Sequence, residues 1–190
     1  MTDVIYKTVY FEKSGPENTE ETIKLAKERA EELGIKNIVI ASTKGETGIK
    51  ASEVFRGCNI VVVTHATGFR EPDVQELLPE NRDIIGRNGA KILTATHAFR
   101  TLGKSILTKF GTIQIDGIIA NVLRLFGQGM KVACEITCMA ADAGLMRTDE
   151  EAIAIGGSGG GADTAVVLKP CNTHTLFDLK INEIICKPRL

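Results

Sequence analysis

Apolar side chains along this chain fall into short runs that alternate with longer segments of helical spacing. Three runs lack polar alternation, as expected of parallel strands that are buried on both faces: residues 35–42, 59–65 and 90–97. Two helical segments are amphipathic and are each followed by a glycine: residues 19–33 and 47–56. This order of strands and helices predicts a parallel sheet with right-handed crossover connections.

The remaining segments complete the predicted fold. Residues 3–11 are β-branched and aromatic and predict a first strand. Three more helical segments are expected: residues 83–88, residues 101–126 with interruptions at Gly111 and Gly117, and residues 130–143. Three strands joined by short turns are expected near the C-terminus: residues 151–155, 164–168 and 179–186. The predicted class is a three-layer α/β fold in one domain (residues 1–190), with a mostly parallel sheet, flanking helices and antiparallel C-terminal strands.

Composition argues against several classes of function. The 190 residues carry a net charge of −1 with scattered lysines and arginines, so neither nucleic-acid binding nor a membrane-surface patch is expected. No apolar run approaches the roughly 18 residues of a spanning helix, and the start of the chain lacks the pattern of a signal peptide. Cys134 and Cys138 share a helix face, but zinc would need further ligands. We expect free thiols, no metal site and a cytoplasmic protein.

The junction after the first buried run is the first candidate binding site. A helix follows this strand directly, and backbone N–H groups at a helix N-terminus attract anions. Hydroxyl groups, an ammonium group and glycines at the junction suit a phosphate: Ser42, Thr43, Lys44, Gly45, Thr47 and Gly48. The Walker spacing of nucleotide triphosphatases is absent. An ordinary turn capped by Thr47 is the alternative, which the carboxylate of Glu46 favours.

Two later strand ends are expected at the same edge, because ligands of open α/β sheets lie outside the carboxyl ends of the strands. They carry a repeated Thr-His pair and residues that can contact a planar ring: His65, Thr67, Gly68, Phe69, Thr96 and His97. Structural hydrogen bonding by the histidines and packing by the phenylalanine are the alternatives. His174 lies in a polar turn, where a solvated side chain is expected.

A glycine run near the C-terminus is the third candidate. Gly157, Ser158, Gly159 and Gly160 allow a backbone to approach a ligand closely or to form a nest of N–H groups. The run matches a dinucleotide fingerprint and a nucleophile elbow, but both require a helix directly afterwards, where residues 163–168 favour a strand. A flexible hairpin turn is the alternative.

Residues 38–56 resemble the C-terminal α/β domain of pyruvate kinase, in which a strand ends in a Thr-x-x-Gly-x-Ser-type loop that binds a sugar-phosphate effector. Ser42, Gly45 and Thr47 fall on the matching positions, and residues 60–64 are similar to the next strand of that domain. The resemblance covers roughly residues 20–100, and the rest is similar to stand-alone, mainly archaeal proteins built on this domain. It implies binding of flavin mononucleotide (FMN). The pyruvate kinase catalytic barrel has no counterpart here, so phosphoenolpyruvate chemistry is not expected.

Three functions remain open from the sequence. The first is binding of FMN or a related phosphate ligand, with the phosphate on residues 42–48 and the ring near the two histidines and the glycine run. The second is a non-catalytic regulatory module that binds a sugar phosphate and acts on a partner. The third is a small hydrolase that uses Ser158. A homo-oligomer is compatible with each of these functions.

Overall fold

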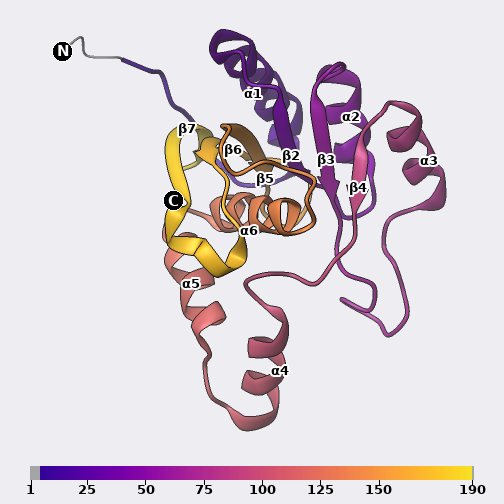
Figure 1. Cartoon of the computed structure of the whole chain (residues 1–190), viewed down its shortest axis with the longest axis vertical. Helices are drawn as coiled ribbons and strands as arrows, with labels where there is room; N and C mark the ends of the chain where they lie inside the picture. The colour runs from indigo at the N-terminus through magenta and orange to yellow at the C-terminus, as the bar shows by residue number, and fades with distance from the viewer. Residues whose placement is uncertain (1–4, 190) are drawn as a thin grey trace.

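One seven-stranded sheet forms the centre of the protein, as seen in a computed structural model that describes residues 5–189 (Figure 1). The strands are β1 (Val9–Phe11), β2 (Asn37–Ala41), β3 (Asn59–Val63), β4 (Lys91–Leu93), β5 (Ala152–Gly156), β6 (Thr164–Lys169) and β7 (Lys180–Pro188). Their order in the sheet is β1-β7-β6-β5-β2-β3-β4. Strand β6 pairs antiparallel with β5 and β7, and the other pairs are parallel. The predicted fold class is confirmed.

Helices cover both faces of this sheet and complete three layers. One face carries α1 (Thr19–Leu33), α2 (Glu46–Val54) and α3 (Pro79–Arg87). The other face carries α6 (Gln128–Asp142), with α5 (Ile115–Arg124) packed against it and α4 (Thr101–Phe110) projecting from the body (Figure 1). Two 3-10 helices, η1 (Pro16–Asn18) and η2 (Thr173–Asp178), lie in connections. Within the described residues no single helix has the length and apolarity to cross a membrane; α4 and α5 pass that test only as a pair bent by 109°.

The central strands are apolar on both sides because helices cover both of their faces. In β2, Ile40 packs into the core beneath α1 and α2, whereas the neighbouring Val39 packs into the core beneath α6, and both are fully buried. Ile40 lies opposite Val62 of β3 and Ile155 of β5 in the parallel ladders. The apolar runs in the sequence therefore form the middle layer of the molecule.

The N-terminal strand is shorter than predicted and lies at an unexpected edge. Of the predicted strand 3–11, residues 3–4 lie outside the described part, and the described residues form a strand only over Val9–Phe11. This strand pairs in parallel with β7 at the far edge of the sheet, and three strands separate it from β2. Its partner lies at the other end of the chain, so local sequence carried no information about its position.

Three other predicted boundaries were wrong, while the rest agree within a few residues. The apolar run 90–97 is a strand only over Lys91–Leu93, because β4 is an edge strand and the chain then turns toward α6. Helix α3 begins earlier than predicted, at Pro79, a residue well tolerated at the first helical position. Gly111 ends α4 with a φ of 71°, but Gly117 lies inside α5 and interrupts nothing.

Truncation of Phe55 will test how strongly this core is packed. The Phe55 side chain is 0% exposed, whereas the adjacent Val54 is 40% exposed. Phe55→Ala is expected to lower the free energy of unfolding by about 3–5 kcal/mol, because it leaves a cavity in the core. Val54→Ala, the matched control, will change it by less than about 1 kcal/mol. Urea unfolding followed by circular dichroism measures both; equal effects would contradict the packing described.

Candidate functional site

The loop between β2 and α2 forms the first wall of the candidate site. The N–H of Ser42 donates to the carbonyl of Val63 on β3 at 2.9 Å, and the Ser42 hydroxyl oxygen accepts the N–H of Gly48 at 3.0 Å. Ser42 therefore ties the first turn of α2 to the sheet, in place of the cap that the sequence assigned to Thr47. The N–H groups of residues 43–47 donate no hydrogen bond within residues 5–189. This helix N-terminus therefore has the donors that an anion requires.

The start of α3 holds this loop in place. The carbonyl of Lys44 accepts hydrogen bonds from the Leu78 N–H at 3.2 Å and from Asn81 Nδ2 at 3.0 Å. Gly45 has a φ of 113° and lies against the Asn81 side chain, so any larger residue there would be both strained and obstructed. The Thr43 side chain is half-buried and that of Lys44 is exposed. The backbone of the loop is therefore held in place, while the side chains of Thr43 and Lys44 remain accessible to a ligand.

Two histidines from neighbouring strand ends meet beside this loop. The ring centroids of His65 and His97 lie 5.6 Å apart, and the Phe69 ring stacks on His65 at 4.0 Å. His65 Nδ1 lies 2.6 Å from Glu76 Oε2, and Arg70 Nε lies 3.1 Å from Glu76 Oε1. Burial lowers the pKa of His65, against the attraction of Glu76. The structure thus brings together the strand ends that the sequence placed at one edge.

A buried ion pair on α6 lies behind the histidines. The Lys131 ammonium contacts the Glu135 carboxylate, and these residues are 3% and 2% exposed. Glu135 Oε1 accepts the Phe99 N–H at 2.8 Å, and His97 Nδ1 lies 3.5 Å from Glu135 Oε2. The other nitrogen of His97 accepts the Ala66 N–H at 3.4 Å, which assigns the ring proton to Nδ1, facing the carboxylate. The buried negative charge of Glu135 is therefore compensated by three partners: the Lys131 ammonium, the Phe99 N–H and the His97 ring.

The charge state of this pair follows from its surroundings. Burial by itself raises the pKa of Glu135, but the hydrogen bond from His97 and the charge of Lys131 outweigh burial and lower that pKa to about 2. Burial lowers the pKa of Lys131, against the attraction of Glu135. Neither residue was predicted as part of the site. The available signal was a Lys-Glu pair at i and i+4 among apolar neighbours, which indicates a compensated buried charge.

A small cavity of about 90 Å³ lies between the loop and the histidines. Its border includes predicted and unpredicted residues from five segments: Ser42, Thr43, His65, Phe69, His97, Arg100, Arg124, Lys131 and Glu135. The guanidinium of Arg100 lies 4.7 Å from the centre of the Phe69 ring. Arg100, Arg124 and Lys131 bring positive charge to the same cavity that the α2 loop borders. This arrangement suits a phosphate or another small anion.

A larger cavity of about 750 Å³ adjoins the same strand end. Thr96 and His97 line it together with apolar side chains from α4, α5 and α6: Leu102, Ile106, Ile115 and Met139. The carboxylates of Asp116 and Asp142 also lie at its border. Its volume falls within the roughly 300–1,000 Å³ of ordinary small-molecule sites. His97 lines both cavities, so it lies where the two spaces adjoin.

The glycine run lies at the same edge of the sheet but lines neither cavity. It connects β5 to β6. Because a strand follows the run, the helix required by the dinucleotide fingerprint and by the nucleophile elbow is absent there. The loop packs against the start of α1, where the Ala162 N–H donates to Thr19 Oγ1 at 3.0 Å. A Cβ on Gly156 would overlap the carbonyl of Gly129 at the start of α6. Packing thus accounts for part of the run, and Gly157, Ser158, Gly159 and Gly160 border neither of the cavities that the histidines line.

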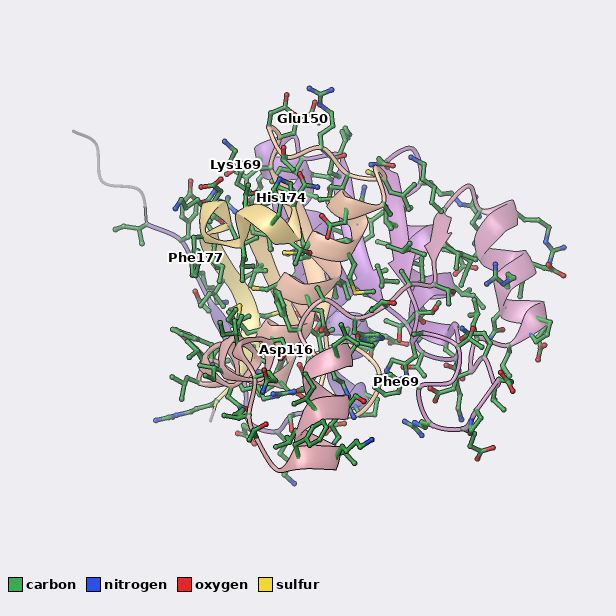
Figure 2. All side chains as sticks on the ribbon, turned by 60° about the horizontal axis from the view of Figure 1, so that its bottom comes forward. Phe69, Asp116, Glu150, Lys169, His174 and Phe177 are labelled. Carbon is green, nitrogen blue, oxygen red and sulfur yellow. The ribbon has the colours of Figure 1, made fainter. Side chains whose placement is uncertain are left out.

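The remaining predicted residues lie on the surface. Thr67 and Gly68 are exposed in the loop that follows β3, and the Thr67 hydroxyl accepts a hydrogen bond from Gln75 Nε2 at 3.3 Å. His174 is exposed in η2, between the end of β6 and the start of β7, at the edge of the sheet opposite the candidate site. In Figure 2, His174 lies in the upper part of the view and Phe69 in the lower part.

The fold and this edge define an α/β domain with a candidate anion site at the carboxyl ends of its parallel strands. The family profile described as "Pyruvate kinase, alpha/beta domain" matches residues 20–168. The match covers most of the 190 residues, and the chain therefore belongs to this family. It extends beyond the resemblance found in residues 20–100 and includes α6, which carries the buried ion pair.

The dependence of stability on pH will report the burial of Glu135. Its folded pKa of about 2 lies below the ordinary value of 4.5, so its contribution is complete above the ordinary value and is lost as the pH falls toward 2. The shift corresponds to on the order of 3 kcal/mol. In Glu135→Gln, the free energy of unfolding in urea is therefore expected to change less on acidification than in the wild type.

The readout is the slope of the free energy of unfolding against pH. The free energy at neutral pH is not suitable, because Glu135→Gln also leaves the buried Lys131 without its carboxylate partner and changes stability for that reason. Glu53→Gln on the exposed side of α2 is the control and should keep the wild-type slope. An unchanged slope in Glu135→Gln would contradict an ionised, compensated carboxylate at this position.

Proposed function

We propose that this protein binds a phosphorylated small molecule at the carboxyl edge of its sheet, and that the ligand is FMN. The observation that supports this proposal is the meeting of two anion-attracting features at one cavity. One is the α2 N-terminus, where the N–H groups of residues 43–47 make no hydrogen bond within residues 5–189. The other is the pair of arginines at the cavity border, Arg100 and Arg124.

The two cavities suit the two halves of FMN. The small cavity of about 90 Å³ accepts a phosphate group but lies well below the roughly 300 Å³ lower bound of ordinary ligand sites. The larger cavity of about 750 Å³ has the volume and the apolar wall that a flavin ring requires, with Thr96 available for a polar contact. His97 borders both cavities and would lie along a ligand that occupied them together.

The residues of this chain would bind and orient such a ligand. FMN supplies redox chemistry when it is bound, whereas the protein supplies position and electrostatics. Because Glu135 balances Lys131, the net attraction for a phosphate would come from Arg100, Arg124 and the α2 N–H groups. Free cysteines in the described part of the chain are in keeping with the cytoplasm as the place of this function.

Flavin binding will be visible in the absorbance spectrum. The purified protein, or protein incubated with FMN and desalted, is expected to carry the visible flavin bands. Arg124→Met should weaken FMN binding by about tenfold, because it removes a charged donor from the phosphate. Arg56→Met, an exposed position at the end of α2, is the control and should leave affinity unchanged. Colourless protein that retains no FMN would overturn the cofactor assignment.

A regulatory module that binds a sugar phosphate is the second candidate. It is favoured by one observation, that the small cavity has room for a phosphate without requiring a ring. Such a ligand would use the same loop, where Ser42, Gly45 and Thr47 match the effector loop of the kinase domain.

A thermal-shift comparison separates the two candidates. At saturation FMN is expected to raise Tm by roughly 5–10 °C, and riboflavin, which lacks the phosphate, by much less. Stabilisation by a hexose phosphate, but neither by the free hexose nor by FMN, would establish the regulatory alternative. If no phosphorylated compound shifts Tm, phosphate binding at this edge is refuted.

A further inference from the structure

Helix α5 presents an apolar face that no other part of residues 5–189 covers. Its outward side chains are large and strongly exposed: Ile115 (75%), Ile118 (49%), Val122 (53%) and Leu125 (73%). Their spacing alternates between three and four residues, which is the spacing of the a and d positions in a coiled coil. Single exposed apolar residues are ordinary, but a continuous line of them marks an interaction surface.

The other side of α5 is already engaged within the chain. Ala120 is 2% exposed in the core beneath α6, and the Asp116 carboxylate lies against Gly103 of α4; Figure 2 labels Asp116 at the junction of these helices. Arg124 bonds Gln128 Oε1 at 2.7 Å and borders the small cavity. Both charged residues of α5 thus serve inward contacts, and its outward side carries none.

Further large apolar side chains are exposed on α4 and in the segments on either side of α5. Four of them are at least half exposed: Leu102 (78%), Phe110 (66%), Ile113 (54%) and Phe126 (50%). With the four from α5, they expose on the order of 900 Å² of side-chain surface. This total is comparable with the ~800 Å² that each partner buries in a standard interface.

The spacing along α5 is symmetric, and this symmetry identifies the partner. Ile115 and Leu125 lie equally far from Ala120 on either side, and so do Ile118 and Val122. When two such helices pack antiparallel about a twofold axis, Ile115 of each copy faces Leu125 of the other, and Ile118 faces Val122. Every outward side chain then meets an apolar partner of similar size, as an isologous interface requires.

We propose that the protein forms a twofold-symmetric dimer in which α5 packs antiparallel against α5 of a second copy. A lipid surface is a less suitable occupant, because helices that bind membranes carry basic residues along their polar face. The acidic residue and the basic residue of α5 are both engaged within the chain, and the basic residues exposed nearby, among them Lys104 and Lys109, lie on α4.

Charge substitutions at facing positions test this pairing directly. Sedimentation velocity of the wild type is expected to show a dimer, and Ile118→Glu or Val122→Lys should each weaken it by at least about tenfold, because a charge is buried without a partner. An equimolar mixture of I118E and V122K should restore the dimer, because each introduced carboxylate then faces an introduced ammonium. Phe177→Glu, 88% exposed in η2, is the control and should leave the dimer unchanged.

Other results would overturn the proposal. Circular dichroism and thermal unfolding first establish that the variants are folded, which is expected because both positions are half exposed. A wild-type protein that stays monomeric at its highest soluble concentration excludes the dimer. A dimer that survives both single substitutions places the interface elsewhere. A monomer that sediments with phosphatidylserine vesicles, and loses this property in Ile118→Glu, assigns the surface to lipid instead.

Discussion

Burial of the central strands on both faces is the constraint on which this structure depends. Val39 and Ile40 are adjacent in β2 and enter opposite cores, so helices must cover both sides of the sheet. The covered strands β2, β3 and β5 run in one direction and are joined by crossover connections, whereas β6, covered on both faces as well, runs antiparallel to β5. The carboxyl ends of the parallel strands, with the helix N-terminus that follows β2, then meet at one edge. The candidate site follows from this arrangement before any particular side chain is considered.

At that edge a buried carboxylate organises the surrounding segments. Glu135 forms an ion pair with Lys131 and accepts a hydrogen bond from the Phe99 N–H. The protonated ring nitrogen of His97 also faces its carboxylate. These contacts attach the irregular segment after β4 to α6 and set the position of His97 between the two cavities. Because the Lys131 charge is balanced within the protein, attraction for an anion depends on Arg100, Arg124 and the α2 N-terminus. The Lys131–Glu135 pair therefore positions the segments around the site, whereas Arg100, Arg124 and the α2 N-terminus supply its positive electrostatic potential.

Helix α5 connects this site to the outer surface. Arg124 borders the smaller cavity, and Ile115 both borders the larger cavity and belongs to the outward apolar line. A helix held between α6 and a second copy would keep the cavity walls in a fixed position. Ligand binding and association would then be linked through one element, since each would stabilise the same placement of α5.

The sequence by itself determined the elements whose signals are local. Apolar runs without alternation identified the central strands, and the strand-to-helix junction at residues 42–48 located one wall of the site. Only the tertiary structure decided features that depend on distant partners. The N-terminal strand pairs with β7, the run 90–97 leaves the sheet early at an edge, and the glycine run packs against α1 instead of joining the histidines. The Lys131–Glu135 pair was hidden for the same reason: a charged pair on a helix is exposed or buried according to what packs against it.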